Sequence, residues 1–497
     1  MDSLTSRRLR LPGRPRDRFW LTVGLCALTA ALFFLPFYIL DGGFFHYAGD
    51  FNSQQISFYR YMNGFVKGLG YPDSPLAGAA SNTFSWATDL GSGAMNAYSF
   101  YLYGSPFFWF SLIFPQQWLP YLMVPLLVLK FAVAGGGAYR YLRRYVQNAN
   151  FAVLGACLYT FSGFSVYNIF FNHFIDVVAL FPWMLAALDE AMYEHRHGPF
   201  AFWAALNLLN NYFFFVGQVL FLVIYFVCKV SAGDVKLTPK LFARLAFESL
   251  LGVALGFILL WPAVLSVLQN PRTIDLSSGW GFLTYSKVQQ YLAILVSWIL
   301  PPDSPYMTSI WSEGVIKWTS MSAYLPLCSL AGAMAYWRSR KTDSKKRIVA
   351  VCAVCALVPV LNSAFYALNS SYYARWYYMP TLILAAMTVN ALEDPDVDLD
   401  APARGIGWIM LATLVFAVVP VRDDTTGTWS FGVLKNPEQF FVVLGFGLLG
   451  LMLYRYLCGI WRQNSRFAQR MTAAVLVFAC VFSMVHIGIG KFGQWHT

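Results

Sequence analysis

Apolar runs long enough to cross a bilayer dominate this chain and constrain its fold more than any motif. Of its 497 residues, 58% are hydrophobic and 12% are charged, whereas about a quarter of the residues of a soluble protein are charged. A transmembrane helix needs about 20 mostly apolar residues. Runs of this kind begin near Phe19, Trp118, Asn150, Phe174, Phe200, Leu245, Trp318, Ile348, Trp376, Gly405, Glu438 and Met471. The sequence therefore predicts an all-α polytopic membrane protein.

The run at residues 200–230 is too long for one span and too polar in its first half. It carries no charge before its end, and basic residues flank it on both sides. If both flanks are cytoplasmic, the run crosses twice. Asn207, Asn210 and Asn211 fall within the first half, which favours two short, broken helices. This raises the expected number of spans to thirteen.

The basic residues predict how the helices are oriented. We count 25 of the 35 Lys and Arg residues in predicted inner segments and nine in outer ones, which is the positive-inside pattern of membrane proteins. The net charge of +11 is therefore a signal of topology and not of a nucleic-acid partner. We expect a bacterial plasma membrane protein with a cytoplasmic N-terminus and an outer C-terminus.

The expected organisation follows from the runs and their flanks. Residues 1–18 form a basic cytoplasmic N-terminus, and residues 19–40 form the first transmembrane helix. A large outer loop at residues 41–117 contains interfacial helices. Residues 118–268 hold transmembrane helices 2–7, and residues 269–317 form a second long outer loop. Helices 8–13 occupy residues 318–490, and residues 491–497 form an outer tail.

Cysteine and histidine usage gives no sign of a metal or a cofactor. The eight cysteines lie in or at the ends of apolar runs, so core packing is the main interpretation, with zinc or redox chemistry at Cys352 and Cys355 as the alternative. The histidines show no metal-ligand spacing. The chain also lacks a cytoplasmic nucleotide-binding domain, so an enzyme acting on the outer face needs a donor substrate carried by a lipid.

The first outer loop holds the first candidate site residues. Asp50 and Asp89 lie there among Gln54, Arg60 and Trp86. A carboxylate at a membrane interface can act as a general base on an acceptor hydroxyl. We expect Asp50 to have this catalytic role and the other four to bind substrate, with Trp86 stacking on a sugar. The alternative is that Asp50 only caps the helix that follows.

Asp176 and His173 lie at the outer start of the fourth span. Ionisable groups in apolar helices are costly to bury and tend to be functional, so Asp176 is a second catalytic candidate. A carboxylate in the first turn of a helix also interacts favourably with the helix dipole, which is the structural alternative. His173 can tune Asp176, or it is an interfacial histidine.

Arg375 lies at an outer membrane boundary among tyrosines and a tryptophan. A guanidinium offers two parallel donors to a phosphate, so Arg375 is a candidate for binding a phosphate headgroup. The alternative is an arginine that snorkels through an aromatic belt. Lys317, in the second outer loop, is a weaker candidate of the same kind.

Several segments resemble the YfhO-type family of bacterial membrane proteins. They follow one another in the family's order: Gly49-Asp50-Phe51-Asn52-Ser53-Gln54-Gln55, Phe84-Ser85-Trp86 through Gly91-Ser92-Gly93, Tyr101 to Pro106, Tyr159-Thr160-Phe161-Ser162-Gly163-Phe164, and Asn172 to Pro182. That family in turn resembles the GT-C glycosyltransferases. The resemblance implies transfer of a sugar from a polyprenyl-phosphate donor to an envelope glycopolymer, such as teichoic acid, or to a glycolipid.

The resemblance also implies roles for single residues. The acidic residue in the first outer loop, which maps onto Asp50, is the general base, and Asp176 and Arg375 map onto a second acid and an arginine further along. Two other functions stay open: a transporter or flippase for lipid or polysaccharide, and a structural partner of envelope machinery. Inverted repeats and charges at mid-membrane are typical of transporters, whereas here charges other than Lys130 lie at the membrane edges.

Overall fold

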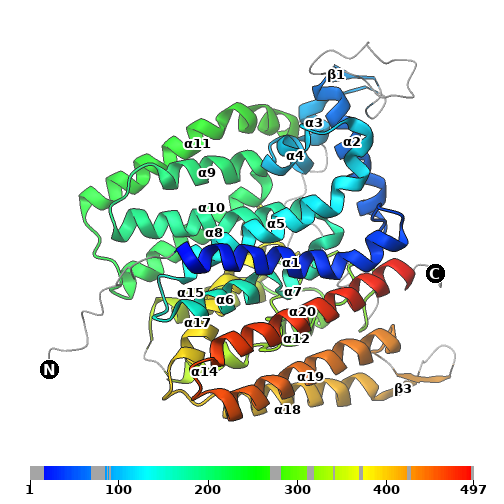
Figure 1. Ribbon diagram of the computed structural model, residues 1–497, viewed down its shortest axis with the longest axis vertical. Coiled ribbons are helices and arrows are strands. Elements are labelled where there is room, and N and C mark those ends of the chain that lie inside the picture. Colours follow the sequence, from blue (N-terminus) through cyan, green and yellow to red (C-terminus); the bar gives the residue numbers. More distant parts are fainter. Residues whose placement is uncertain are drawn as a thin grey trace.

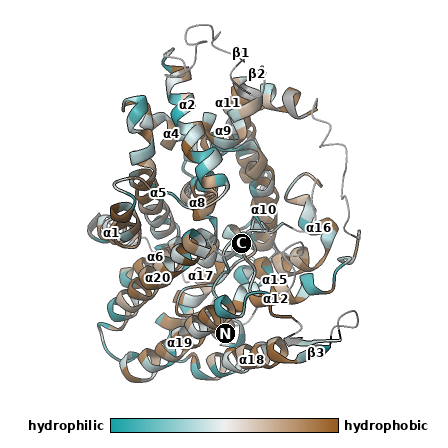
Figure 2. Cartoon of the chain, turned by 90° about the vertical axis from the view of Figure 1, so that its right-hand side faces the viewer, coloured by the Kyte–Doolittle hydropathy of each residue, from teal (hydrophilic) through white to brown (hydrophobic). Residues whose placement is uncertain are grey.

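The computed structural model describes residues 16–68, 84–86, 88, 91–268, 281–310, 318–339, 342–368, 373–422, 427–431 and 433–493. Long helices lie side by side in a bundle, and short elements collect at one end of it (Figure 1). Apolar residues dominate the long helices, and hydrophilic residues gather around α2 (Figure 2). Asp89 and Lys317 lie outside the described residues.

Four helices form the first layer of the bundle: α1 (Arg16–Leu40), α5 (Leu119–Leu142), α6 (Ala149–Thr160) and α8 (Asn172–Tyr193). Helix α5 packs against the other three, and glycines allow this close approach. A Cβ atom on Gly135 would lie 2.5 Å from the Cys26 sulfur, and one on Gly137 would lie 2.6 Å from Trp183. These glycines serve helix packing because any larger side chain would push the helices apart.

Short elements fold over the outer end of this layer. They are η1 (Phe51–Ile56), α2 (Ser57–Val66), β1 (Phe84–Ser85), β2 (Ser92–Gly93), α3 (Ala94–Tyr98), η2 (Ser99–Tyr103), α4 (Pro106–Ser111) and η3 (Gln116–Trp118). Strands β1 and β2 pair antiparallel, with Phe84 opposite Gly93. None of these elements is long enough to cross a bilayer. Together they form a polar cover on an apolar bundle.

The run at residues 200–230 is divided into two helices, α9 (Pro199–Asn210) and α10 (Tyr212–Ser231). The break falls at Asn211, whose side chain accepts hydrogen bonds from the backbone N–H groups of Phe213 and Phe214. An asparagine that caps a helix in this way satisfies donors that the first turn leaves unpaired. The polar residue in the run therefore sets the position of the break. Helix α11 (Pro239–Leu268) follows and packs against α9.

The remaining elements complete the bundle. They are α7 (Gly163–Tyr167), η4 (Asn168–Phe170), α12 (Gln289–Ile299), α14 (Ala331–Ser339), α15 (Ser344–Leu357), α16 (Pro359–Ala364), α17 (Tyr378–Glu393), α18 (Asp400–Val418), β3 (Pro420–Arg422), β4 (Trp429–Phe431), α19 (Pro437–Trp461) and α20 (Phe467–Phe492). Strands β3 and β4 form an antiparallel hairpin. Helix α20 returns to the first layer, where it packs against α1 and α6.

Eight of the described helices are long and apolar enough to cross a membrane, so the thirteen expected spans are not confirmed. Four of the other five expected spans correspond to helices that are short or polar: α8, α9, α15 and α17. The fifth, expected to begin near Trp318, is wrong, because residues 318–330 form no helix and only the short helix α14 follows. The end of α20 nevertheless lies beside the end of α1, because Lys491 pairs with Asp41 at 2.6 Å. Both ends lie opposite the start of α1 (Figure 1). The chain between these points therefore crosses the bundle an odd number of times, so the set of crossings is not identical to these eight candidate helices.

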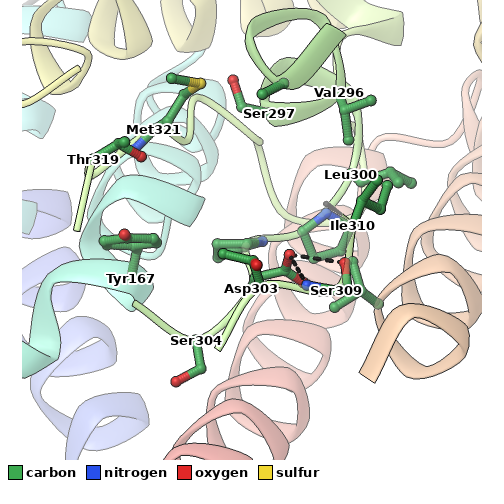
Figure 3. A pocket seen from close by; sticks show the side chains of 15 residues that line it. Tyr167, Val296, Ser297, Leu300, Asp303, Ser304, Ser309, Ile310, Thr319 and Met321 are labelled. Atoms are coloured by element: carbon green, nitrogen blue, oxygen red, sulfur yellow. Dashed lines mark hydrogen bonds between the residues drawn. The ribbon is translucent and has the colours of Figure 1, made fainter. Parts of the chain in front are cut away.

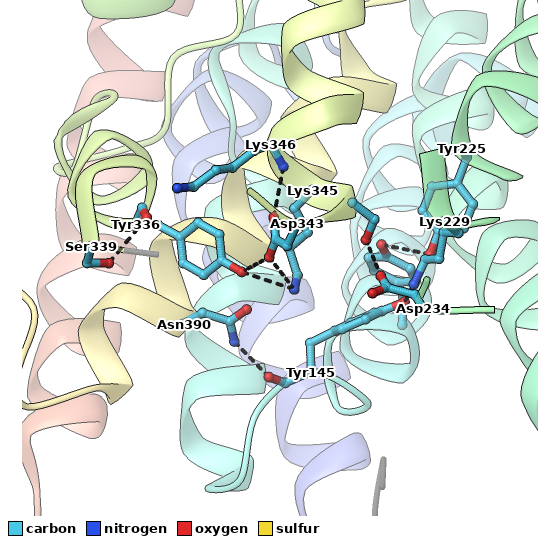
Figure 4. A network of polar contacts seen from close by, with 12 residues as sticks. Tyr145, Tyr225, Lys229, Asp234, Tyr336, Ser339, Asp343, Lys345, Lys346 and Asn390 are labelled. Carbon is cyan, nitrogen blue, oxygen red and sulfur yellow. Dashed lines mark hydrogen bonds and ion pairs between the residues drawn. The ribbon is translucent and has the colours of Figure 1, made fainter. Parts of the chain in front are cut away.

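A buried polar network ties the helices together at the end of the bundle opposite the outer loop (Figure 4). The Lys229 ammonium donates to the Tyr145 hydroxyl at 2.8 Å and to the Tyr193 hydroxyl at 3.0 Å. The Asp189 carboxylate accepts from Tyr145 and from Tyr225. Because buried polar groups are costly unless they are paired, this network fixes the relative positions of α5, α8 and α10.

Candidate functional site

Asp50 lies in the loop between α1 and η1 and does not cap the helix that follows. Its backbone is in the helical region, and its side chain makes no capping hydrogen bond. One carboxylate oxygen instead accepts from the Gln54 side-chain amide at 3.3 Å. Gly49 precedes it with φ of +42°, a conformation that glycine adopts most easily, and a Cβ there would lie 3.0 Å from Phe170. The chain before η1 therefore turns tightly on the bundle and leaves the carboxylate free of any capping role.

Arg375 lies just before α17 and is held between aromatic rings. Its guanidinium carbon is 4.1 Å from the centre of the Tyr373 ring and 5.1 Å from that of Phe174. A cation over the faces of aromatic rings is stabilised by their quadrupoles. Its Nε atom is buried and has no hydrogen-bond partner among the described residues. The position of the chain is fixed by a hydrogen bond from the Ala374 N–H to the Thr319 carbonyl at 2.7 Å.

Asp50 and Arg375 act on each other electrostatically. Burial raises the pKa of the Asp50 carboxyl above its ordinary value, and the positive charge of Arg375 opposes that shift. The two side chains form no direct ion pair, and within the described part of the chain the Asp50 carboxylate has one hydrogen-bond donor, Gln54. The carboxylate and the guanidinium are therefore near enough to influence each other without being joined.

His173 adjoins this pair from the start of α8. Its ring packs against Phe100, Tyr101 and Phe174, with ring centres 5.2, 5.2 and 4.5 Å away. Neither ring nitrogen has a hydrogen-bond partner among the described residues. Arg375 and Lys130 both lie close enough to act on it electrostatically. The structure therefore brings His173 together with Arg375, on either side of Phe174.

Asp176 forms an ion pair with Lys130. From the sequence, Lys130 was identified only as a charge inside a span. The Lys130 ammonium lies 2.6 Å from one carboxylate oxygen of Asp176, and the Ser105 hydroxyl donates to the other at 2.5 Å. Lys130 also donates to the Asn172 side chain at 2.7 Å. Both charged side chains are fully buried. The pair joins α5, α8 and the turn before α4, so Asp176 anchors the outer loop on the bundle.

The remaining candidates lie further out. Arg60 is on α2, about 15 Å along the helix from Asp50 at 1.5 Å per residue, and its carbonyl accepts from the Gln116 amide. Trp86 follows β1 and is 65% exposed, so its side chain lies on the surface of the outer loop. The roles of Asp89 and Lys317 stay predictions, because both residues lie outside the described part.

The sequence did not single out Asp303 or Tyr167. Asp303 follows Pro301-Pro302, directly after α12, and Tyr167 ends α7. Tyr167 lies within electrostatic range of both Arg375 and Asp303, so these residues belong to the same outer end of the bundle as Asp50. The sequence signal for Asp303 was weak, because two prolines that end a helix and are followed by an acidic residue occur in many loops.

This chain is similar to known structures at low sequence identity. The apo structure of ArnT from Cupriavidus metallidurans aligns with a TM-score of 0.51 and 13% identity over 96% of this chain and 78% of that chain. The structure of the same protein bound to undecaprenyl phosphate gives a TM-score of 0.49 and 12% identity over the same shares. The arabinosyltransferase EmbB from Mycobacterium smegmatis gives 0.44 and 13%, over 98% of this chain and 43% of that chain.

The apo ArnT match shows a GT-C-like fold for this chain. A search of curated proteins finds no match. The description "Bacterial membrane protein YfhO" belongs to a family model that matches residues 23–495. That match covers nearly the whole chain, from within α1 to beyond the end of α20. The protein therefore belongs to the YfhO family of bacterial membrane proteins.

Proposed function

We propose that this protein is a GT-C-type glycosyltransferase that acts at the outer face of the plasma membrane. It transfers a sugar from a polyprenyl-phosphate donor to an envelope glycopolymer or glycolipid. The observation that carries the proposal is the arrangement of Asp50, an acid oriented by Gln54, and Arg375, a cation held over aromatic rings, which act on each other electrostatically. The GT-C-like fold supports it.

The reaction needs one base and one cation. The acceptor hydroxyl oxygen forms a bond to the anomeric carbon of the donor sugar as the bond from that carbon to the phosphate oxygen breaks. Asp50 takes the hydroxyl proton, and the lipid phosphate leaves with the bonding electrons. Arg375 stabilises the negative charge on that phosphate through two parallel hydrogen bonds. Proton transfer to a positioned base typically contributes about 10²–10⁴-fold to the rate.

The surroundings of Asp50 suit a base. Its raised pKa makes the carboxylate a better proton acceptor than an exposed aspartate, and the pKa of a general base is best near the working pH. Gln54 orients the carboxylate through one hydrogen bond. The remaining oxygen lone pairs are available to an acceptor hydroxyl.

Asp176 suits a positioning role better than a catalytic one. Its carboxylate is committed to Lys130 and Ser105, and it is buried inside the bundle, away from any acceptor polymer. We therefore assign catalysis to Asp50 and place His173 and Arg375 on the donor side of the site. The polyprenyl phosphate is taken as the donor carrier because undecaprenyl phosphate is bound in a structure of ArnT, whose apo form shares this fold.

One observation favours a transporter or flippase as the second candidate. Lys130 and Asp176 form a buried ion pair within the bundle, and ionisable groups inside membrane helices often mark ion or substrate pathways. In this chain the pair also holds the outer loop through Ser105, which accounts for it without transport.

The test is sugar transfer in membranes from a labelled polyprenyl-phosphate donor. Wild type is compared with Asp50→Asn and with Asp396→Asn, an exposed aspartate on the loop between α17 and α18, at matched expression. We expect transfer by wild type and Asp396→Asn and none by Asp50→Asn. Equal transfer by all three would rule out Asp50 as the base. Absence of transfer from every polyprenyl-phosphate sugar tried, with donor lipid translocated across vesicles, would favour the flippase.

A further inference from the structure

A cavity with a mainly apolar lining lies between α12, α7 and the chain that follows Pro301 (Figure 3). Water can occupy about 70 Å³ of it. Its walls are apolar on the side of Val296, Leu300 and Ile310 and polar on the side of Tyr167 and Asp303. A cavity with one apolar and one polar wall is typical of binding sites for small organic molecules.

Two buried oxygen atoms on the polar side lack a hydrogen-bond partner among the described residues. They are Oδ1 of Asp303 and the hydroxyl of Tyr167. The other oxygen of Asp303 is fixed, because it accepts from the backbone N–H and the hydroxyl of Ser309, each at 2.8 Å. Gln439 lies beside Asp303 and donates one of its two amide hydrogens to the Met307 carbonyl, and Thr319 and Ser320 lie beside Tyr167. Buried polar atoms are nearly always paired, and these two oxygens can accept further hydrogen bonds from a ligand in the cavity.

The charge of the cavity restricts the ligand. Asp303 is the one titratable acid among the lining residues, and no lysine, arginine or histidine is among them. A phosphate or carboxylate would be repelled by Asp303 and would find no cation there. A neutral molecule with hydroxyl groups can donate to the Asp303 oxygen and exchange a hydrogen bond with Tyr167. Two vicinal hydroxyls, as found on sugars and polyols, can form the hydrogen bond to Asp303 and the one to Tyr167 at the same time.

The size of the cavity agrees with such a group. One bound water needs roughly 10–15 Å³, so the space holds about five waters. A terminal glycol unit or one edge of a sugar ring displaces a similar number of waters. A whole disaccharide does not fit inside, and the rest of a longer molecule must extend out of the cavity.

The cavity adjoins the Asp50–Arg375 arrangement through Tyr167 and Thr319. Tyr167 lies within electrostatic range of Arg375 on one side and Asp303 on the other. Thr319 lines the cavity, and its carbonyl accepts the N–H of Ala374, the residue before Arg375. A molecule that enters the cavity therefore lies beside the proposed site of transfer.

We propose that this cavity is the acceptor subsite, where Asp303 and Tyr167 bind vicinal hydroxyls of the sugar or polyol unit that receives the transferred sugar. The acceptor role rests on the proposed glycosyltransferase function. The binding of a vicinal diol in this cavity does not depend on that function. Asp303 and Tyr167 bind and orient the acceptor, and Asp50 remains the base.

The first experiment measures transfer to two small acceptors, glycerol and methyl β-glucoside, by purified protein in lipid nanodiscs. The variants are Asp303→Asn and Tyr167→Phe. Tyr454→Phe is the matched control, because the buried hydroxyl of Tyr454 on α19 also has no hydrogen-bond partner among the described residues, and Tyr454 does not line the cavity. We expect both test variants to raise the KM for the acceptor at least about tenfold, since each loses a hydrogen bond in a buried site. Turnover of the donor by water and the KM for the donor stay at the wild-type values.

The second experiment does not depend on activity. Saturation-transfer difference NMR with methyl β-glucoside detects contact between this probe and the protein. We expect a signal with wild type and Tyr454→Phe and a much weaker one with Asp303→Asn and Tyr167→Phe. The thermal unfolding midpoint of each variant shows whether it is folded.

The outcomes separate the two proposals. Wild-type KM values and wild-type NMR signals in Asp303→Asn and Tyr167→Phe would overturn the acceptor subsite, and so would the absence of an NMR signal with wild type. If wild type shows the Asp303-dependent signal but neither transfers nor hydrolyses any donor, the diol site stands and the transferase proposal fails. If only a probe with an ammonium group binds, the cavity is a site for cations and the proposal is wrong.

Discussion

At the scale of single residues, Asp50 and Asp176 differ in the charged groups that surround their carboxylates. Asp50 faces Arg375 without touching it, whereas Asp176 is neutralised by Lys130 within a direct ion pair. A carboxylate that is already paired with a lysine is a poor proton acceptor, because protonating it would leave the lysine unpaired in the bundle. The same residue type therefore has a chemical role at one position and an architectural role at the other.

The pH dependence of transfer tests the role of Asp50. Only the carboxylate can accept a proton, so activity falls as pH drops through its pKa, and burial places this fall at a higher pH than for an exposed aspartate. Arg375 lowers that pKa, so Arg375→Gln moves the acid limb of kcat/KM to still higher pH, besides reducing the rate. Lys435→Gln, at an exposed lysine of the outer face, serves as the control. An acid limb that stays in place in Arg375→Gln would show that another group controls it.

The buried ion pair predicts a pattern of stabilities. Lys130→Met leaves Asp176 buried without a cation, and Asp176→Asn leaves Lys130 without an anion. Each change is expected to cost about 3–5 kcal/mol, since removing one partner of a buried pair is strongly destabilising. The double variant has no uncompensated charge and should recover much of this loss. Unfolding midpoints of the four proteins in detergent form the double-mutant cycle, and additive losses would contradict the assignment.

These residues also show what the sequence can and cannot predict. Asp50 and Arg375 each lie next to an apolar run, so their outer location could be predicted from hydropathy. Their proximity could not, because no periodicity connects a loop near the start of the chain with a helix start more than 300 residues later. The ion pair of Lys130 could have been predicted from the sequence, because a lysine in an apolar run needs a buried acid and Asp176 lies in another apolar run. Asp303 could not be recognised, since its function depends on a cavity.

At the scale of elements, the outer loop is held by close backbone contact as well as by the ion pair. Gly104 ends η2 beside the C-terminal end of α9, where a Cβ atom would lie 1.7 Å from the Leu209 carbonyl oxygen. Asn211 donates a hydrogen bond from its side chain to the Phe100 carbonyl at 2.7 Å. The asparagine that divides α9 from α10 thus also binds the loop. The two-helix interpretation of residues 200–230 could be reached from the flanking charges, but this second use of Asn211 could not.

Gly104→Ala is expected to displace the outer loop from α9. A side chain at that position overlaps the backbone of another element, and such overpacking typically costs about 1–3 kcal/mol or more. Gly405→Ala on α18 is the matched control, because nothing lies within 4 Å of its Cβ position and alanine favours a helix over glycine by about 1 kcal/mol. Limited proteolysis should cut the loop faster in Gly104→Ala and at the wild-type rate in Gly405→Ala. Equal cleavage rates would mean that the loop adjusts to the extra methyl group.

At the scale of the whole molecule, hydropathy predicts the class of fold but not the number of crossings: thirteen spans are expected from the sequence, and eight of the described helices are long and apolar enough to cross a membrane. The long apolar helices are recognisable because each one faces lipid along part of its surface. Helices such as α8 and α17 are almost fully buried in the bundle, so they can be short or polar and still cross it. Their surroundings are protein, and a threshold set for contact with lipid does not apply to them.

Cysteine labelling tests the expected orientation. Helix α18 separates Arg404, near its start, from Lys435, in the loop beyond its end, and both side chains are exposed. In intact cells, a membrane-impermeant maleimide should label Lys435→Cys, and it should label Arg404→Cys only after permeabilisation. The parent protein controls for the native cysteines. Labelling of Arg404→Cys in intact cells would invert the topology and move Asp50 and Arg375 to the cytoplasmic face.

The contact between the end of α20 and the end of α1 has a consequence for the order in which the protein folds during synthesis. Lys491 binds Asp41, the Tyr306 hydroxyl donates to the Gly490 carbonyl, and Gly490 packs against Tyr47, shortly before Asp50. These contacts come from the last turns of α20, which leave the ribosome after all the other described helices. A nascent chain can insert its earlier helices in order, but the loop that carries Asp50 lacks these contacts until α20 has been synthesised and inserted. Chemistry at the site of Asp50 is thus expected to depend on the insertion of α20.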